Sequence, residues 1–216
     1  MYRDEKYEVF DYLAKKDAQR FRVRDFISRH DIKVLHRAKM VDWMIEVLYT
    51  FKCSLNTLFL AVQIMDRYFG VCHRTLNLDG LHLLGVTAMF MASKYEDIKP
   101  LNMKTVYNKI AHTKLSEDSI RQMEAKIVQA FNFEIAFPTC WEFFEHLAEN
   151  SKNEMWNEEK LKHIKALGKQ YMMGAIHDID IVTSWNELQV ATAAFQLAVK
   201  TVSPKSLPAV NSLIEE

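Results

Sequence analysis

Apolar positions recur along this chain with helical spacing almost throughout, and the strict alternation of a β-strand is almost absent. In the first half the pattern predicts helices near residues 37–52, 56–70, 78–96, 103–112 and 117–132. The helix at 78–96 is apolar nearly all round, which is typical of a helix in the middle of a bundle. We expect Asn56 or Thr57 to cap the second of these helices and Ser116 the last.

Pro138 marks the one convincing boundary along the chain, because the segment around it turns and a new series of helices begins. This series is predicted near residues 141–150, 158–177, 184–202 and 207–216. An apolar helix recurs here at 190–199, so we expect two related all-α units in tandem. A short amphipathic helix that contains Tyr7, Phe10 and Leu13 is predicted before them.

The composition supports a helical chain. Five glycines and four prolines among 216 residues are far fewer than the roughly 12 % of an average protein. Sandwiches and barrels need many turns, and turns need these two residue types, so an all-β fold is disfavoured. An apolar content of 49 % argues against disorder.

Charge and cysteine content limit the classes of binding partner and the cellular environment that we expect. Lys and Arg number 28 and balance 28 Asp and Glu, so neither direct nucleic-acid binding nor attraction to an anionic membrane is expected. The most apolar stretch, 81–92, is shorter than the ~20 residues of a membrane span, and the charged residues 1–6 exclude a signal peptide. Three cysteines without a CxxC pair indicate a reduced, intracellular environment.

Catalytic signatures are absent. The five glycines stand apart from one another, so no phosphate-binding loop forms, and neither GxSxG nor HExxH occurs. His177, Asp178 and Asp180 have the chemistry of metal ligands, but a solvated polar loop at a helix end is the favoured interpretation. Cys53 and Cys72 are expected to fill core space rather than act as nucleophiles. We therefore predict no catalytic site, no metal and no cofactor.

The helix predicted from about His36 carries two apolar faces. One face is a core stripe made of Val41, Met44, Ile45 and Leu48. The other contains His36, Met40, Trp43 and Val47 at helical spacing. The second face has two interpretations, a wide buried face or a shallow groove that captures an apolar peptide. In a groove, Trp43 would be the anchor and Glu46 could pair with a basic residue of the peptide.

Two charged residues interrupt apolar helix faces. Glu124 lies on a stripe with Ile120, Ile127 and Phe131, and an unpaired carboxylate there would be costly. Lys94 lies near the C-terminal end of the apolar helix, where the helix dipole favours a cation. Lys94 and Glu124 could therefore meet. Their pair is either an internal salt bridge or a polar site on an apolar surface that binds the backbone of another protein.

Three stretches of this chain resemble one known family. HRAKMVDWMIEV (36–47), MASKYEDI (91–98) and IRQMEAKIVQAFNFEI (120–135) are similar to helices one, three and five of the cyclin box, in the same order and spacing. The second and third stretches resemble a B-type, mitotic-like cyclin. The resemblance implies an all-α fold of tandem cyclin boxes, with an N-terminal helix and connector at 1–33 and a five-helix first box at 34–136. A second box at 137–216 would end one helix early.

The resemblance also implies a function in cell-cycle control. A cyclin is not an enzyme; it binds and activates a cyclin-dependent Ser/Thr protein kinase in the nucleus or cytoplasm and helps to recruit substrates. Lys94 and Glu124 match the family residues that engage the kinase. By analogy, further kinase contacts are expected from Met91, Tyr95, Phe133, Val9 and Phe10.

A substrate-docking patch is implied as well, since Trp43 and Glu46 match the family patch that takes basic-x-leucine motifs. Four positions depart from the family pattern: His36, Lys39, Met40 and His82. Lys39 places a positive charge where apolar contact is expected, so the resemblance predicts weak docking or an altered preference. Two other hypotheses remain open, a cyclin-fold transcription adaptor that activates no kinase and a helical enzyme with an unrecognised site.

Overall fold

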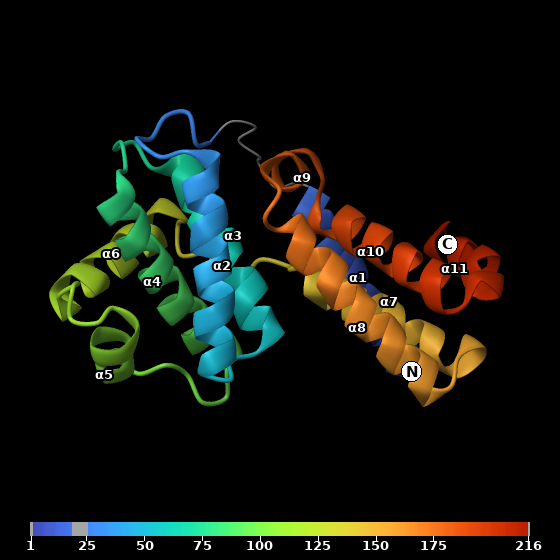
Figure 1. The fold of residues 1–216 in the computed structure, drawn as a ribbon. Helices are drawn as coiled ribbons and strands as arrows, with labels where there is room; N and C mark the ends of the chain where they lie inside the picture. The colour runs from blue at the N-terminus through green and yellow to red at the C-terminus, as the bar shows by residue number, and fades with distance from the viewer. Residues whose placement is uncertain (1, 19–25, 216) are drawn as a thin grey trace. The chain divides into compact units, whose positions relative to one another are not determined.

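The structure of the protein is a computed structural model, and it describes residues 2–18 and 26–215; side chains are not described at 2–9, 152–155, 213 and 215. The described residues form helices, turns and loops without a β-strand, so the predicted all-α class is confirmed. The chain divides into two compact units. The central unit spans Arg22–Phe137, and the terminal unit combines Met1–Phe21 with Pro138–Glu216 (Figure 1).

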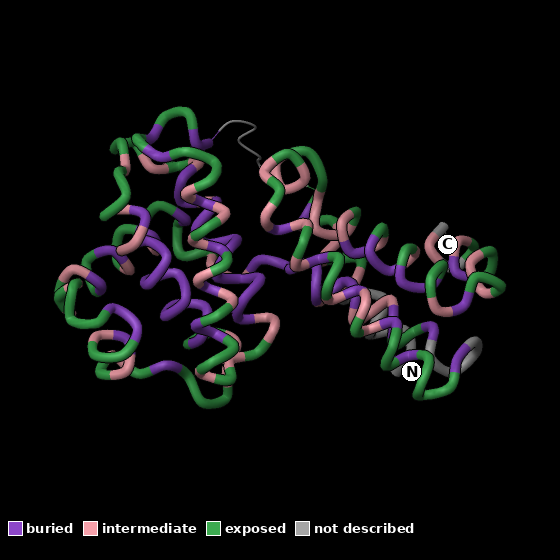
Figure 2. Tube along the Cα trace, viewed as in Figure 1, coloured by how far each residue is buried: buried purple, intermediate pink, exposed green. Residues whose placement is uncertain are grey.

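Helix α4 is the core helix of the central unit. The helices of this unit are α2 (Val34–Thr50), α3 (Leu55–Val71), α4 (Leu78–Glu96), the single turn α5 (Met103–Thr105) and α6 (Glu117–Ala130). Helix α4 packs against α2, α3 and α6, and a π-helical turn at Val106–Ile110 also contacts it. Every residue from Leu84 to Ser93 is buried, as the prediction of an apolar helix inside a bundle requires (Figure 2).

Helix caps in the central unit follow the local sequence. The Ser116 side chain accepts a hydrogen bond from Ser119 N, as predicted, and Asn77 caps α4 in the same way by accepting from Gly80 N. The prediction that Asn56 or Thr57 caps α3 is wrong. Ser54 is the cap, because its extended backbone lets its hydroxyl accept from Thr57 N, so the helix begins at Leu55.

A buried ion pair, which no local sequence pattern predicts, joins α2 to α3. Arg37 Nε donates to Asp66 Oδ1 at 2.8 Å, and Arg37 Nη2 donates to Asp66 Oδ2 at 2.6 Å. The two side chains are 0 % and 4 % exposed. Removing one partner of such a pair costs about 3–5 kcal/mol, since the other charge stays buried.

Helix α10 is the core helix of the terminal unit. Besides α1 (Tyr2–Ala18), the unit contains α7 (Cys140–Met155), α8 (Glu158–Ala175), α9 (Ile179–Ser184), α10 (Glu187–Val202), a 3-10 turn (Pro204–Ser206) and α11 (Leu207–Glu215). Helix α10 packs against α7, α8, α11 and α1. The single helix predicted at 184–202 is wrong at its start. Asn186 accepts from Gln189 N and begins a new helix, which separates α10 from the short α9.

Helix α1 belongs to the terminal unit although it lies at the other end of the chain. The ring of Phe10 stacks on His146 at a centroid distance of 4.3 Å and meets Phe143 edge-on at 5.5 Å. Leu188 N, in the first turn of α10, donates to Asp17 Oδ2 at 3.1 Å. These contacts place α1 against α7 and α10, so the terminal unit is assembled from both ends of the sequence.

Residues that resembled metal ligands have local structural roles. Asp178 caps α9 by accepting from Asp180 N and Ile181 N, and His177 Nδ1 lies 2.6 Å from the carbonyl of Met173. Over the described residues, no cluster of His, Cys, Asp or Glu side chains is arranged to hold a metal ion. None of the described helices combines the length and the hydropathy needed to cross a bilayer.

Candidate functional site

Lys94 and Glu124 meet, as their positions in the sequence suggested. Lys94 lies in the last turn of α4 and Glu124 in the middle of α6, and Lys94 Nζ donates to Glu124 Oε1. The side chains are 39 % and 24 % exposed, so the pair is neither buried nor free in solvent. Lys94 Nζ also lies 4.2 Å from the centroid of the Phe90 ring, close enough for a cation–π interaction.

Large apolar side chains are exposed on the segments that carry this pair. Tyr95 is 55 % exposed, Ile98 is 100 % exposed, and Phe133, three residues after α6, is 77 % exposed. Exposed large apolar groups mark an interaction surface where they form one contiguous patch. We call Lys94, Tyr95, Ile98, Glu124 and Phe133 the Lys94 surface. Ile98 is the member that the sequence analysis did not single out.

The backbone at Phe133 is unusual. Its φ of 66° and the φ of 49° at Asn132 lie in the left-handed region, where bulky residues are rare. Phe133 N donates to the carbonyl of Val128 at 2.9 Å, which ends α6 in this conformation. An exposed aromatic ring on a strained turn is a recurrent feature of binding sites.

Asp97 fixes the end of α4 beside the Lys94 surface. Its carboxylate accepts from Ser54 N and from Ser93 Oγ, each at 2.9 Å, and thereby joins α4 to the start of α3. Burial acts to raise the pKa of Asp97, but hydrogen bonds from Ser54, Thr57, Ser93 and Cys53 outweigh it, so the pKa is lowered. The lowered pKa favours the ionised form of Asp97. This carboxylate accepts the hydrogen bonds that join the end of α4, next to Tyr95 and Ile98, to the start of α3.

Three of the predicted kinase contacts lie elsewhere. Met91 is only 3 % exposed, because its side chain packs inside the central unit, so its predicted contact with a kinase stays a prediction and it is not counted in the Lys94 surface. Phe10 is half-buried against α7 in the terminal unit. Val9 is part of α1, but its side chain lies outside the described residues.

Most of the predicted docking residues line one groove in the central unit. This groove, the α2–α4 groove, has a volume of about 410 Å³. Helix α2 contributes His36, Lys39, Met40 and Trp43, helix α4 contributes Leu78, Leu81 and His82, and the loop region after α5 contributes Ile110, Ala111, His112 and Lys114. Glu46 is exposed on α2 but does not line the groove.

Close helix packing shapes the floor of the α2–α4 groove. A Cβ atom at Gly85 would lie 2.5 Å from Met40 Sδ, so the Met40 side chain rests in its present position on α4 because residue 85 is glycine. The ring centroids of Trp43 on α2 and His82 on α4 lie 5.4 Å apart, with the ring planes tilted by 54°. Burial, together with the nearby charge of Lys114, lowers the pKa of His82.

The charged side chains that line the α2–α4 groove are all positive. Its lining contains Lys39, Lys114 and three histidines, and it contains no carboxylate. Trp43, Met40, Leu81 and Ile110 supply apolar area in the same place. The groove thus combines an apolar floor with a positive rim.

Neither thiol near the core is suited to nucleophilic chemistry. Burial, together with the charge of Asp97, raises the pKa of Cys53 to about 12, and burial also raises the pKa of Cys140. A protonated thiol is a poor nucleophile.

Comparison with known proteins gives the family. Residues 8–136 match the family described as "Cyclin, N-terminal domain". The protein named putative cyclin-A3-1 from Arabidopsis thaliana is 28 % identical over 214 residues, which cover 96 % of this chain and 57 % of that protein. G2/mitotic-specific cyclin-B from Marthasterias glacialis is 30 % identical over 199 residues, which cover 91 % of this chain and 48 % of that protein. The chain thus spans about half the length of these relatives.

A solved structure agrees in fold. The X-ray structure of a viral cyclin from herpesvirus saimiri matches with a TM-score of 0.75 over 96 % of this chain and 97 % of that chain. The sequences are 14 % identical, so this match concerns the fold. Relatives named A-type and B-type match at similar identity, and the finer assignment to the B-type therefore stays a prediction.

Proposed function

Since this chain belongs to the cyclin family, we propose that it binds a cyclin-dependent protein kinase through the Lys94 surface and activates that kinase without catalysing a reaction itself. The observation that carries the proposal is the partly exposed Lys94–Glu124 pair, together with the exposed side chains of Tyr95, Ile98 and Phe133 on the segments that carry it. Charged groups offer hydrogen bonds to a partner's backbone, and the exposed apolar groups supply area to bury.

Activation of this kind is a population shift. A protein kinase is active when its catalytic Lys–Glu pair and its activation loop are in place. A partner that binds this arrangement better than the inactive one raises its population by the difference in affinity. A surface with a fixed backbone serves this purpose, and hydrogen bonds to Asp97 at the end of α4 and from Phe133 N after α6 support the backbone on which the Lys94 surface is built.

Kinase binding tests the proposal directly. We expect Lys94→Glu and Glu124→Ala each to weaken binding to purified cyclin-dependent kinases by about tenfold or more, measured by calorimetry, with the thermal unfolding midpoint little changed. Lys126→Glu is the matched control, since Lys126 is exposed on the same helix as Glu124. The double variant Lys94→Glu/Glu124→Lys restores an internal pair. If it also restored full binding, the pair would be structural only, and unchanged binding by both single variants would refute the proposed surface.

We also propose that the α2–α4 groove docks short peptides of substrates or inhibitors, with a preference shifted away from basic motifs. The positive rim of Lys39 and Lys114 supports this shift, because like charges at an interface oppose binding. In fluorescence polarisation, a basic-x-leucine peptide should bind more weakly than the same peptide with glutamate at the basic position. Trp43→Ala should abolish both signals. Tight binding of the basic peptide that Trp43→Ala abolishes would contradict the shift in preference.

A further inference from the structure

A segment with unusual backbone geometry lines the α2–α4 groove, and we call residues 106–114 the π-turn segment. It begins with the π-helical turn Val106–Ile110, and Ala111 N continues the same pattern by donating to the carbonyl of Val106 at 2.8 Å. The next two residues, His112 and Thr113, both have positive φ, at 48° and 59°. A positive φ is rare for a β-branched residue such as threonine. Both π-turns and residues with strained backbones are frequent at functional sites.

The π-turn segment brings two basic side chains to the groove. His112 and Lys114 both line it, and both are exposed to solvent. Their backbone is held by hydrogen bonds, since Thr113 N donates to the carbonyl of Tyr107 and Lys114 N to the carbonyl of Ala111, each at 2.9 Å. The strained turn therefore presents two basic groups to a ligand from a fixed backbone.

Positive charge is concentrated at this side of the groove. Burial and the charge of Lys114 lower the pKa of His82, and the charge of His112 acts in the same direction, although Asp79 opposes them. Lys114, His112 and His82 therefore lie close enough to feel one another's charge. In the part of the chain that the structure describes, neither Lys39 nor Lys114 forms an ion pair. The groove thus holds positive charge that no ion pair among these residues neutralises.

His36 adds a hydrogen-bond donor on α2. Its Nδ1 accepts a hydrogen bond from Lys33 N at 3.0 Å. The nitrogen that accepts carries no proton, so in the neutral ring the proton is on Nε2, which is a donor. Because His36 also lines the groove, donors belong to both α2 and the π-turn segment.

The basic side chains adjoin an apolar floor. The ring centroid of His82 lies 5.4 Å from that of Trp43, and Met40 and Leu81 line the same groove. A short peptide can therefore place an apolar side chain on Trp43 and an anionic group beside Lys114 at the same time. This combination of charge and apolar area defines the chemistry of the occupant.

We propose that the α2–α4 groove recognises a phosphorylated peptide of a partner protein, with its phosphate held by His82, His112 and Lys114 and an apolar side chain on Trp43. This inference rests on the proposal that the groove docks peptides, and it adds their chemical class. A phosphate monoester carries about −1.5 to −2 charges at neutral pH and three acceptor oxygens, whereas a carboxylate carries a single charge. Several donors with unneutralised positive charge match the phosphate better.

Docking then depends on the modification state of the partner. An unphosphorylated peptide offers the groove only its apolar side chain, and the positive charge around it stays without a counter-charge. A phosphate supplies that counter-charge and forms charge-assisted hydrogen bonds with the basic side chains. The groove therefore selects partners that a protein kinase has already modified.

A peptide series tests the proposal by fluorescence polarisation. The probes are labelled versions of the basic-x-leucine peptide with phosphoserine, serine or glutamate at the basic position, and with zero to three residues between that position and the leucine. At the best spacing, the phosphoserine peptide should bind about tenfold or more tightly than the serine peptide, and more tightly than the glutamate peptide. A difference of less than about twofold between phosphoserine and serine at every spacing overturns the proposal.

Two lysine variants locate the phosphate. Lys114→Glu should weaken the phosphoserine peptide by about tenfold or more and the serine peptide by less than about twofold. Lys109→Glu is the matched control, because Lys109 is exposed on the same segment but does not line the groove. Equal losses in the two variants would indicate attraction to the general charge of the surface and overturn the proposal. Kinase binding through the Lys94 surface should be the same in both variants.

The outcomes separate this inference from the proposal on which it rests. If no peptide of the series bound, peptide docking in the groove would itself be wrong. If the serine and glutamate peptides bound as tightly as the phosphoserine peptide, and Trp43→Ala abolished all three signals, the groove would dock peptides without recognising phosphate.

Histidine NMR gives a second measurement at the site. The phosphoserine peptide should raise the pKa of His82, because a nearby dianion favours the charged imidazole, and the serine peptide should not. The His82 resonances are assigned by their loss in His82→Gln. An unchanged pKa of His82 in the complex would place the phosphate elsewhere and overturn the proposal.

Nucleic acid is the competing occupant of a groove with basic and aromatic side chains. A short oligothymidylate should not displace the phosphoserine peptide when the two are present at equal concentration. Displacement by the oligonucleotide, together with loss of oligonucleotide binding in Lys114→Glu, would assign the groove to nucleic acid and overturn the proposal.

Discussion

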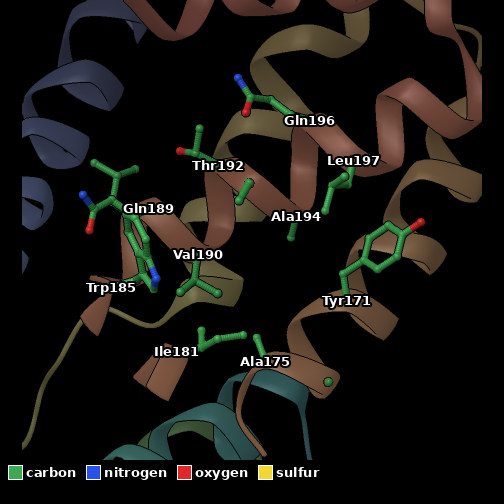
Figure 3. A pocket seen from close by; sticks show the side chains of 13 residues that line it. Tyr171, Ala175, Ile181, Trp185, Gln189, Val190, Thr192, Ala194, Gln196 and Leu197 are labelled. Carbon is green, nitrogen blue, oxygen red and sulfur yellow. The ribbon is translucent and has the colours of Figure 1, made fainter. Parts of the chain in front are cut away.

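Helices α4 and α10 each form the centre of one unit, yet one is enclosed and the other is open along a stripe. In the central unit Val86, Phe90 and Met91 of α4 are buried, and α6 is one of the helices that pack against α4. In the terminal unit one stripe of α10, none of whose residues is buried, lines a groove of about 790 Å³, which we call the α10 groove (Figure 3). The stripe consists of Thr192, Ala193, Gln196 and Leu197. Over the part of the chain that the structure describes, neighbouring helices therefore enclose α4 more completely than α10.

The most direct test of this difference removes apolar volume from α6, which packs against α4, and from the open stripe of α10. Ile127→Ala on α6 should destabilise the protein by about 2–4 kcal/mol, because Ile127 is fully buried and its loss leaves a cavity. Leu197→Ala on α10 should change the free energy of unfolding by less than about 0.5 kcal/mol, since half of that side chain is exposed. Urea denaturation of both variants measures the difference.

The control for this pair is Leu35→Ala, an exposed position of α2 that should behave like Leu197→Ala. Equal destabilisation by Ile127→Ala and Leu197→Ala would mean that the α10 stripe is covered in solution. Such a result would remove the contrast between the units.

The two units also differ in the side chain that packs against a helix glycine. Gly168 of α8 contacts a buried aromatic ring, and Gly85 of α4 contacts a methionine. A Cβ at Gly168 of α8 would lie 2.0 Å from Cζ of Phe144, and a Cβ at Gly85 of α4 would lie 2.5 Å from Met40 Sδ. The Phe144 ring is fully buried and cannot move aside, whereas the end of a methionine side chain is flexible.

Gly168→Ala should therefore cost about 1–3 kcal/mol in thermal or urea unfolding, and Gly85→Ala should cost less. Gly174→Ala is the matched control in the same helix, because nothing lies within 4 Å of a Cβ at that position. If Gly85→Ala were the more harmful change, Met40 would be as rigidly held as Phe144. In that case the α2–α4 groove would be a fixed core feature rather than an adaptable one.

Periodicity predicted the helices well, because an apolar stripe depends on neighbours three and four residues away. The bounds of α4 were predicted correctly, and the meeting of Lys94 with Glu124 was anticipated from two stripes. Periodicity did not predict the burial of Met91. Its position on a stripe indicates which residues share its side of α4, but whether that side is buried depends on the other helices of the unit, among them α6, which begins 26 positions later.

Contacts between distant segments were missed for the same reason. The Arg37–Asp66 pair joins residues 29 positions apart, and no local pattern signals that an arginine amid core residues has a carboxylate partner. The α10 groove was missed because α10 has the composition of a core helix. Comparison with α4 was needed to recognise that one of its faces is left open.

The smallest expected effect concerns His82 and sharpens the contrast between the two grooves, since the α10 groove is lined by no titratable group except Tyr171. Burial and the charge of Lys114 lower the pKa of His82 below its ordinary 6.5, although Asp79 opposes them. Between the lowered pKa and 6.5 the unfolded chain binds more protons than the folded one, so stability rises with pH in that window.

The wild type should therefore lose stability on passing from neutral to mildly acidic pH, and His82→Gln should lose less. Urea denaturation at both pH values measures this, with His163→Gln in the terminal unit as the control. A steeper loss in His82→Gln than in the wild type would contradict the lowered pKa and with it the enclosed position of His82 beside Trp43.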